Sequence, residues 1–200
     1  MTIFEYVIAT LLLIAGLGIA RLLETAVETF RLRDQIRLHW IPIAWVVLVF
    51  LWQMQFLWAI FELEGLIRIW SAGRYALLLA MALLLFVSGA LIVPRPTDDQ
   101  GSDAWEQFMA DDRWALFPLA LFFLLAFFSN PILFGIPLWE WDNVCDLLLF
   151  GVLVFALFLS ETSLRSWRWI TIIFALLSIV ATILLSPAAY QTGEMLGTHP

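Results

Sequence analysis

Six stretches of almost continuous apolar sequence limit most strongly what this chain can fold into. A helix needs about 20 apolar residues to cross the about 30 Å of hydrocarbon in a bilayer. The stretches have close to that length and occupy residues about 3–23, 40–62, 75–94, 114–137, 144–160 and 168–187. The fifth is the shortest, but its run LLLFGVLVFALFLS is too apolar to remain in water. The sequence therefore predicts an all-α polytopic bundle of six transmembrane helices, forming one membrane domain over residues 1–200.

The composition agrees with membrane insertion and excludes some chemistry. Hydrophobic residues make up 63% of the 200 residues and charged residues 14%, whereas soluble domains are about half apolar and about a quarter charged. All ten basic residues are arginine, which excludes Schiff-base chemistry because that chemistry needs a lysine amine. The single cysteine, Cys145, cannot form an intrachain disulfide, so cysteine usage does not indicate a redox compartment.

The arginines predict which ends of the helices face the cytoplasm. Cytoplasmic connections are enriched in arginine, and the first, third and fifth connections hold seven arginines against two in the second and fourth. The seven are Arg31, Arg33, Arg37, Arg95, Arg113, Arg165 and Arg168. We therefore expect these three connections in the cytoplasm and both termini outside. Tryptophan and tyrosine residues at the expected helix ends favour the same boundaries, since both prefer the membrane surface.

The largest extramembrane segment is the acidic third connection, residues 95–113, RPTDDQGSDAWEQFMADDR. Asp103 and Glu106 have the spacing of a capping box, although that motif has serine or threonine in first place. The apolar side chains that follow share one side: Trp105, Phe108 and Met109. This pattern predicts a short helix that lies on the inner membrane surface. The acidic side chains dock a basic partner, concentrate cations or are simply solvated.

A polar stripe continues from the end of the first apolar run, in GLGIARLLETAVETF at residues 16–30. Arg21, Glu24 and Glu28 share one helix face at 100° per residue. Arg21 and Glu24 can pair at i,i+3, whereas Glu24 and Glu28 repel at i,i+4. The stripe is either the cytoplasmic mouth of an ion or solute pathway or the place where the helix leaves the lipid, with Arg21 reaching the headgroups.

The same helix carries small residues at Gly16, Gly18 and Ala20. Small residues allow helix backbones to approach closely, so this part of the helix is predicted to pack against a neighbouring helix. Close approach of a ligand is the alternative.

Two glutamines interrupt the middle of the second apolar run, in WQMQF at residues 52–56. Gln53 and Gln55 point about 200° apart around a helix. An amide in hydrocarbon needs a hydrogen-bond partner, so this helix should contact protein or water on two sides. The amides either bond to neighbouring helices or line a path for a substrate, quinone or ion.

Asn130 and Pro131 lie in SNPILFGIP, residues 129–137, and are predicted to break the fourth helix. Proline lacks the backbone donor and clashes with the preceding turn. Carbonyls freed at membrane depth need protein or a wet cavity around them. The break therefore ends the helix near the outer surface, returns the chain to the membrane interface or binds an ion.

The sequence contains none of the catalytic motifs sought. It has no glycine-rich phosphate loop and no GxSxG, HExxH or CxxC pattern. The two histidines, His39 and His199, fall on opposite sides of the membrane in the expected topology, so they cannot share a metal ion or a haem. No pattern assigns a cofactor or a metal, and nothing indicates nucleic-acid binding.

Five segments of the chain form a set: FEY at residues 4–6, GLGIARLL at 16–23, RLHWIPIAW at 37–45, QFLWAIFEL at 55–63 and FMADDRWALFPLAL at 108–121. As a set they resemble a widespread group of small bacterial six-helix integral membrane proteins, most clearly over residues 1–63 and 108–121. This chain has Glu24 where a basic residue or histidine is expected after the GLGI stretch. The resemblance implies the six-helix architecture in a bacterial inner membrane and supplies no catalytic residues. In such a membrane, the outside termini expected from the arginines are periplasmic.

Two functional hypotheses follow. The first is a non-catalytic subunit or accessory of a larger membrane complex, which agrees with the small connections, the many aromatic packing residues and the lack of a motif. The second is a small channel or transporter, which would be oligomeric because six short helices leave little room for a pore within a single chain. Its support is the stripe at Arg21, the two glutamines and the break at Pro131. A membrane-embedded enzyme has the least support. Expected partners are membrane lipids, other membrane subunits or further copies of the chain.

Overall fold

A computed structural model describes residues 3–31, 37–66, 70–93, 103–135, 137–159 and 163–195. In this part of the chain the secondary structure is entirely helical apart from one isolated bridge between Arg37 and Asp103. The elements are α1 (Ile3–Arg31), α2 (Trp40–Leu66), α3 (Ala72–Ile92), α4 (Ala104–Ala110), the 3-10 helix η1 (Asp112–Ala115), α5 (Leu116–Phe134), α6 (Trp141–Phe158) and α7 (Leu164–Met195). The all-α prediction is confirmed. Parts of the predicted features, including Arg33, Arg95, residues 96–102 and His199, lie outside the described residues.

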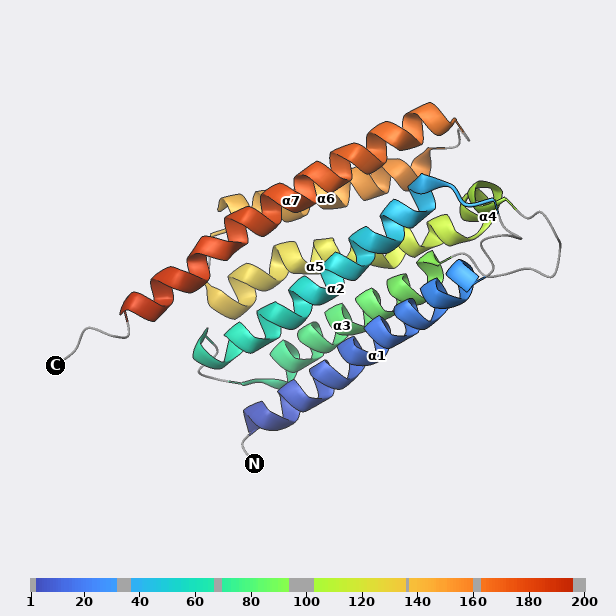
Figure 1. Ribbon diagram of the computed structural model, residues 1–200. Helices are drawn as coiled ribbons and strands as arrows, with labels where there is room; N and C mark the ends of the chain where they lie inside the picture. The colour runs from blue at the N-terminus through green and yellow to red at the C-terminus, as the bar shows by residue number, and fades with distance from the viewer. Residues whose placement is uncertain are drawn as a thin grey trace.

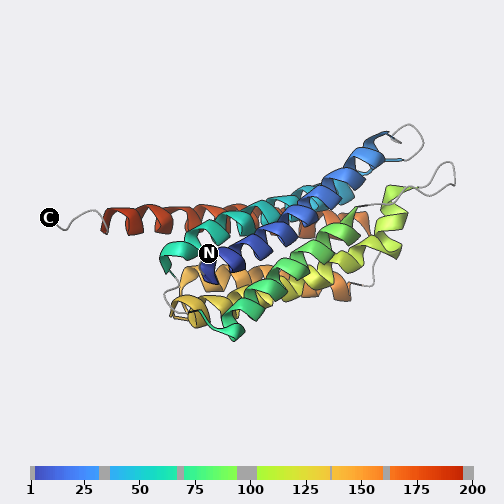
Figure 2. The ribbon, with the colours of Figure 1, turned by 90° about the horizontal axis from the view of Figure 1, so that it is seen from below.

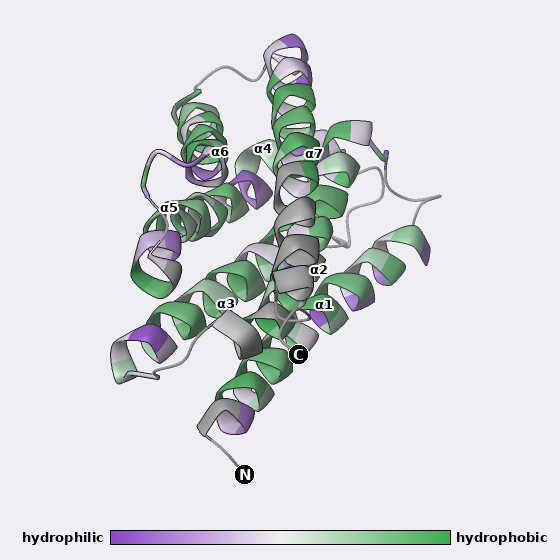
Figure 3. Ribbon diagram, turned by 90° about the vertical axis from the view of Figure 1, so that its left-hand side faces the viewer, coloured by the Kyte–Doolittle hydropathy of each residue, from purple (hydrophilic) through white to green (hydrophobic). Residues whose placement is uncertain are grey.

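Five of these helices are long and apolar enough to cross a membrane: α1, α2, α3, α5 and α7. The apolar part of α6, Asn143–Phe158, is shorter. Hydrophobic residues colour most of each long helix in Figure 3, and hydrophilic residues gather towards the helix ends. The outward side chains are largely apolar, for example Leu13 on α1 and Phe155 on α6, which are 63% and 59% exposed. A surface of this kind needs lipid around it, so the fold is that of a membrane-embedded helical bundle.

The six longer helices form two layers of three. Figures 2 and 3 show α7, α2 and α1 side by side in one layer and α6, α5 and α3 in the other. Contacts join neighbours within each layer and link α1 to α3, α2 to α3 and α6 to α7 across the layers. Successive helices run in opposite directions, and the start of α1 lies at the same end of the bundle as the end of α7 (Figure 1). Helix α2 therefore occupies the middle of its layer, with helices on two sides.

Aromatic side chains fill the interior around α2. The ring of Trp52 meets Phe123 of α5 edge-on, with centroids 4.6 Å apart, and Trp45 lies 4.9 Å from Phe174 of α7. Trp45, Phe123 and Phe174 are fully buried. These large rings fix the distance and rotation of α2 relative to α5 and α7, because the interiors of proteins are closely packed.

The short helix expected in the third connection is present as α4. Its N-cap is Asp103, whose Oδ1 accepts a hydrogen bond from the backbone N–H of Trp105 at 2.9 Å, as expected for a helix start. The apolar face does not lie against lipid as predicted. Phe108 is fully buried, and its ring lies 5.3 Å from that of Trp167 at the start of α7. The end of the bundle offers an aromatic surface that covers this face, which the sequence of the connection does not reveal.

Candidate functional site on helix α2

The polar centre of α2 is the candidate site, because it places two amides in the middle of an apolar bundle. Gln53 is only 2% exposed and lies where α2 meets α1 and α3. Its Nε2 donates a hydrogen bond to the backbone carbonyl of Leu85 on α3 at 3.0 Å. Leu85 lies within α3, so its carbonyl accepts the bond from Gln53 in addition to the backbone hydrogen bond of the helix.

Two glycines make room for this amide, one on each neighbouring helix. A Cβ atom added at Gly18 of α1 would lie 3.3 Å from Gln53 Nε2, and one added at Gly89 of α3 would overlap the same atom. Gly89 is four residues after Leu85, which is the position next to the Leu85 carbonyl in a helix. The lack of a side chain at Gly89 therefore exposes that carbonyl to Gln53.

The junction of α1, α2 and α3 is closed and dry. The space beside Gln53 has no room for a water molecule; it is lined by Ala15, Gly18, Gln53, Phe56, Ala82, Leu85 and Phe86. Within the described residues, the Oε1 atom of Gln53 has no hydrogen-bond partner. Leaving a buried acceptor unpaired costs about 1–3 kcal/mol. The amide is therefore held by one bond and by steric enclosure, and it does not line an open path within the chain.

The second amide lies on the other side of α2 and bonds to α7. The Thr182 hydroxyl is 2.8 Å from Gln55 Oε1, and one turn earlier Trp52 Nε1 donates to Ser178 Oγ at 3.1 Å. Trp52 and Ser178 are buried, whereas Thr182 is exposed. Gln53 and Gln55 thus bond to helices on different sides of α2, as their angular separation requires.

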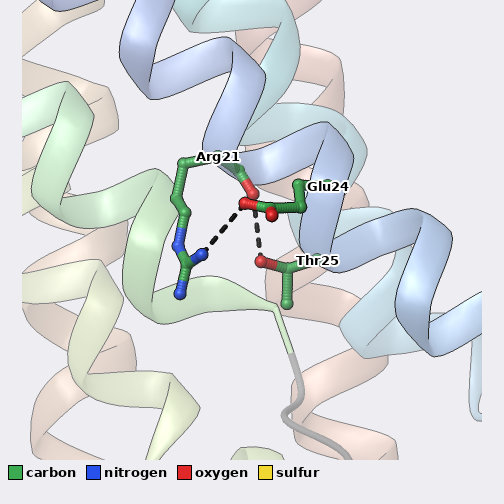
Figure 4. A network of polar contacts seen from close by, with 3 residues as sticks. All are labelled: Arg21, Glu24 and Thr25. Carbon is green, nitrogen blue, oxygen red and sulfur yellow. Dashed lines mark hydrogen bonds and ion pairs between the residues drawn. The ribbon is translucent and has the colours of Figure 1, made fainter.

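The charged stripe on α1 is exposed on the bundle, and Figure 4 shows the contacts among Arg21, Glu24 and Thr25. Arg21 Nη1 and Glu24 Oε2 are 3.0 Å apart, and the two side chains are 56% and 59% exposed. The hydroxyl of Thr25 donates to the carbonyl of Arg21 at 3.0 Å, and Glu28 is exposed. The expected i,i+3 pair is formed, but it is not enclosed by other helices of this chain.

We expect Glu24→Ala to change the free energy of unfolding very little, because exposed ion pairs contribute about 0.2–1 kcal/mol. Thermal unfolding of the purified protein in a neutral detergent measures this, with Glu28→Ala as the matched control for loss of one exposed carboxylate. A loss of more than about 2 kcal/mol for Glu24→Ala alone would mean that Arg21 and Glu24 are desolvated in the folded protein.

The small residues of α1 divide between two faces. Gly18 is buried against α2 and α3, whereas Gly16 and Ala20 are exposed, and a Cβ atom at Gly16 would meet nothing within 4 Å. The prediction that all three pack against a neighbouring helix is therefore corrected for this chain. The reason is angular: residues two apart point about 200° apart, so Gly16 and Gly18 cannot share a face.

Helix α5 continues through Asn130 and Pro131 and ends at Phe134, within the segment 129–137 where the break is predicted but one turn after the two residues named for it. Gly135 ends the helix in the left-handed conformation, with φ 69°, and its N–H donates to the Pro131 carbonyl at 3.1 Å. Proline removes only one helical bond here, and the next turn is completed by Gly135.

Asn130 instead joins α5 to α6. Its Nδ2 donates to Asn143 Oδ1 at 2.7 Å, and Asn143 Nδ2 donates to the carbonyl of Pro137 at 2.8 Å. Asn143 is fully buried. These bonds stabilise the turn between α5 and α6, and the side-chain amides of both asparagines are hydrogen-bonded to protein.

Several partners of the site could not be identified from the sequence alone. Gly89, Leu85, Ser178 and Thr182 complete the bonds of α2, and Asn143 completes that of Asn130. Two sequence features hint at these partners: the adjacent small residues Ser88 and Gly89 in the third apolar run, and the hydroxyl residues Ser178 and Thr182, four residues apart, in the sixth. Neither signal states which helix lies opposite.

Among the described residues there is no group of three or more His, Cys, Asp or Glu side chains that could hold a metal ion. Comparisons of the chain with protein-family models, with curated proteins and with solved structures found no match. The site therefore has to be interpreted from its own geometry.

Proposed function

We propose that the chain is a six-span protein of the bacterial inner membrane that acts, without catalysis, as a subunit or accessory of a larger membrane complex. The observation that carries this proposal is the closed centre of the bundle. The mid-membrane amide at Gln53 is 98% buried by α1, α2 and α3, and the space beside it cannot hold water. A bundle with such a centre exerts its effect through its outer surface, and that surface is apolar.

The proposed topology has six crossings with both termini in the periplasm. Helix α6 has 18 residues, which span about 27 Å at 1.5 Å per residue, close to the hydrocarbon thickness of about 30 Å. Arg31 is the last residue of α1, Arg113 lies in η1 just before α5, and Arg165 is the second residue of α7. The end of α1 and the starts of α5 and α7 lie at one end of the bundle, opposite the start of α1 (Figure 1). This agrees with an arginine-rich cytoplasmic side. Membership of the six-helix bacterial group is part of the same proposal and rests on the five sequence segments.

One observation favours an oligomeric channel as the second candidate. The ion pair of Arg21 and Glu24 and the carboxylate of Glu28 lie on the outer face of α1. Charged groups at a membrane boundary line a pathway only if another chain covers them. Several copies arranged with α1 inward would provide that cover.

The complex mass in a mild detergent separates the two candidates. The subunit hypothesis predicts that the tagged protein co-purifies with a different membrane protein in a fixed ratio, measured by native mass spectrometry. The channel hypothesis predicts copies of this chain alone and an ion or solute flux in liposomes that falls with Glu24→Ala. A monomer without flux and without a partner would contradict both, and Leu13→Ala on the exposed part of α1 serves as the control for the flux assay.

A further inference from the structure

A basic groove opens on the outer side of α7, away from the polar centre of α2. It is shallow and open, and all the side chains that line it come from this one helix: Leu164, Arg165, Arg168, Trp169 and Ile172. These residues occupy the first turns of α7 and share one face at 100° per residue. All five side chains are exposed, so no other helix of the described residues covers this face, and α7 lies at an edge of its layer (Figure 3).

Two guanidinium groups are the polar components of the groove. Arg165 and Arg168 are exposed and stand on successive turns at i,i+3. Neither side chain forms an ion pair or hydrogen bond within the part of the chain that the structure describes. Arg113, in contrast, lies 5.7 Å from the centroid of the Trp114 ring. Guanidinium groups bind phosphate oxygens in a bidentate manner, so the two arginines can both donate hydrogen bonds to one phosphate group.

An apolar track leads from the arginines along α7. Trp169 is 59% exposed at the edge of the groove, and Ile172 follows at its apolar end. The same face continues with exposed residues at helical spacing, namely Leu176, Ile179 and Ile183. Tryptophan prefers the level of the headgroups, and the aliphatic residues beyond it lie at the level of the hydrocarbon. Along α7 this face therefore carries the two arginines first, then the tryptophan and then the aliphatic residues. A phospholipid has its phosphate, its interfacial region and its acyl chains in the same order.

We propose that this groove binds an anionic phospholipid, with its phosphate between Arg165 and Arg168 and an acyl chain along Ile172, Leu176 and Ile179. The apolar track is the reason to name a lipid, because a free phosphate ion would contact only the arginines. This inference rests on the membrane-embedded fold and is independent of whether the chain is a subunit or a channel.

Native mass spectrometry of the full-length protein in a neutral detergent tests the site, with phosphatidylglycerol and phosphatidylcholine of the same acyl chains as probes. Each interfacial arginine contributes about 1 kcal/mol to binding of an anionic surface, or about fivefold in affinity. The double variant Arg165→Gln, Arg168→Gln is expected to bind phosphatidylglycerol about 30-fold more weakly. Its binding of phosphatidylcholine, which is weaker from the start because the choline cation offsets the phosphate charge, should fall by a smaller factor, and sn-glycerol 3-phosphate should not displace the lipid.

The matched control is Arg31→Gln, Arg37→Gln, which removes the same charge from two exposed arginines at the same end of the bundle. It should retain the affinity of the wild-type chain for phosphatidylglycerol. An equal loss of affinity for phosphatidylglycerol in both double variants would mean that net charge alone explains the effect, and this would overturn the proposed site. Equal affinity of the wild-type chain for the two lipids would overturn it as well. Melting in detergent without lipid should be the same for all three proteins, since the substituted side chains are exposed.

Discussion

Gly89→Ala is expected to destabilise the bundle by about 2–5 kcal/mol. The new methyl group would overlap Gln53 Nε2, and adding a methyl group to a filled site costs about 1–3 kcal/mol. Gln53 would also lose its bond to the Leu85 carbonyl, which is worth about 1–2 kcal/mol between helices in a membrane. The displaced amide has no alternative nearby, because the adjoining space cannot take a water molecule. Thermal and denaturant unfolding in detergent measure the loss.

Two further variants identify the cause of the loss. Gln53→Ala removes the obstructing amide, so adding Gly89→Ala to it should cost less than about 1 kcal/mol, and the difference is the coupling energy of the pair. Gly151→Ala in α6 is the matched control, since a Cβ atom there would meet nothing within 4 Å. It should be neutral or slightly stabilising, by up to about 1 kcal/mol. Equal effects of Gly89→Ala with and without Gln53 would show that the amide is not what the glycine accommodates.

Trp167→Ala is expected to cost about 3–5 kcal/mol, as for other large buried aromatic residues. Trp167 is fully buried at the start of α7, and its ring lies against Phe108 and Trp105 of α4. Removing it opens a cavity and removes the surface on which α4 rests. Hydrogen–deuterium exchange of the amides in residues 104–115 should therefore accelerate more than exchange in the middle of α5.

Trp167→Phe should cost less than half as much, because it keeps an aromatic ring and removes an indole N–H that has no partner among the described residues. Trp141→Ala controls for the loss of a tryptophan at a helix start, since Trp141 is 72% exposed. Uniform exchange changes along the whole chain after Trp167→Ala would argue that the residue stabilises the bundle generally and does not hold α4 in particular.

The sequence predicts the helices of this fold well, because length and apolarity decide which segments can be buried in a membrane. The second apolar run, residues about 40–62, became α2 from Trp40 to Leu66. Helix ends are predicted less well where the chain stays helical outside the apolar run. Helix α7 continues past residue 187 to Met195, since residues outside the apolar run can also form helix, whereas the extension of α1 to Arg31 agrees with the helical stripe at Arg21, Glu24 and Glu28.

The contacts of the candidate site are predicted only in part. The opposite directions of Gln53 and Gln55 follow from 100° per residue, and they require partners on two sides of α2. The identity of those partners depends on the depth and rotation of each neighbouring helix, which are set by packing of large rings such as Trp52 against Phe123. For the same reason, nothing in the third apolar run alone indicates that Gly89 faces an amide.

The pairing of α2 with α7 also has a consequence for how the chain is made. Trp52 and its partner Ser178 are separated by 126 residues, which take on the order of 6–25 s to synthesise at about 5–20 residues per second. During that interval the indole N–H of Trp52 and the amide of Gln55 lie in the membrane before the hydroxyls of α7 exist. Until α7 is inserted, these two groups therefore either bond to another partner or remain unpaired, and the pairing between α2 and α7 can form only when the last helix is complete.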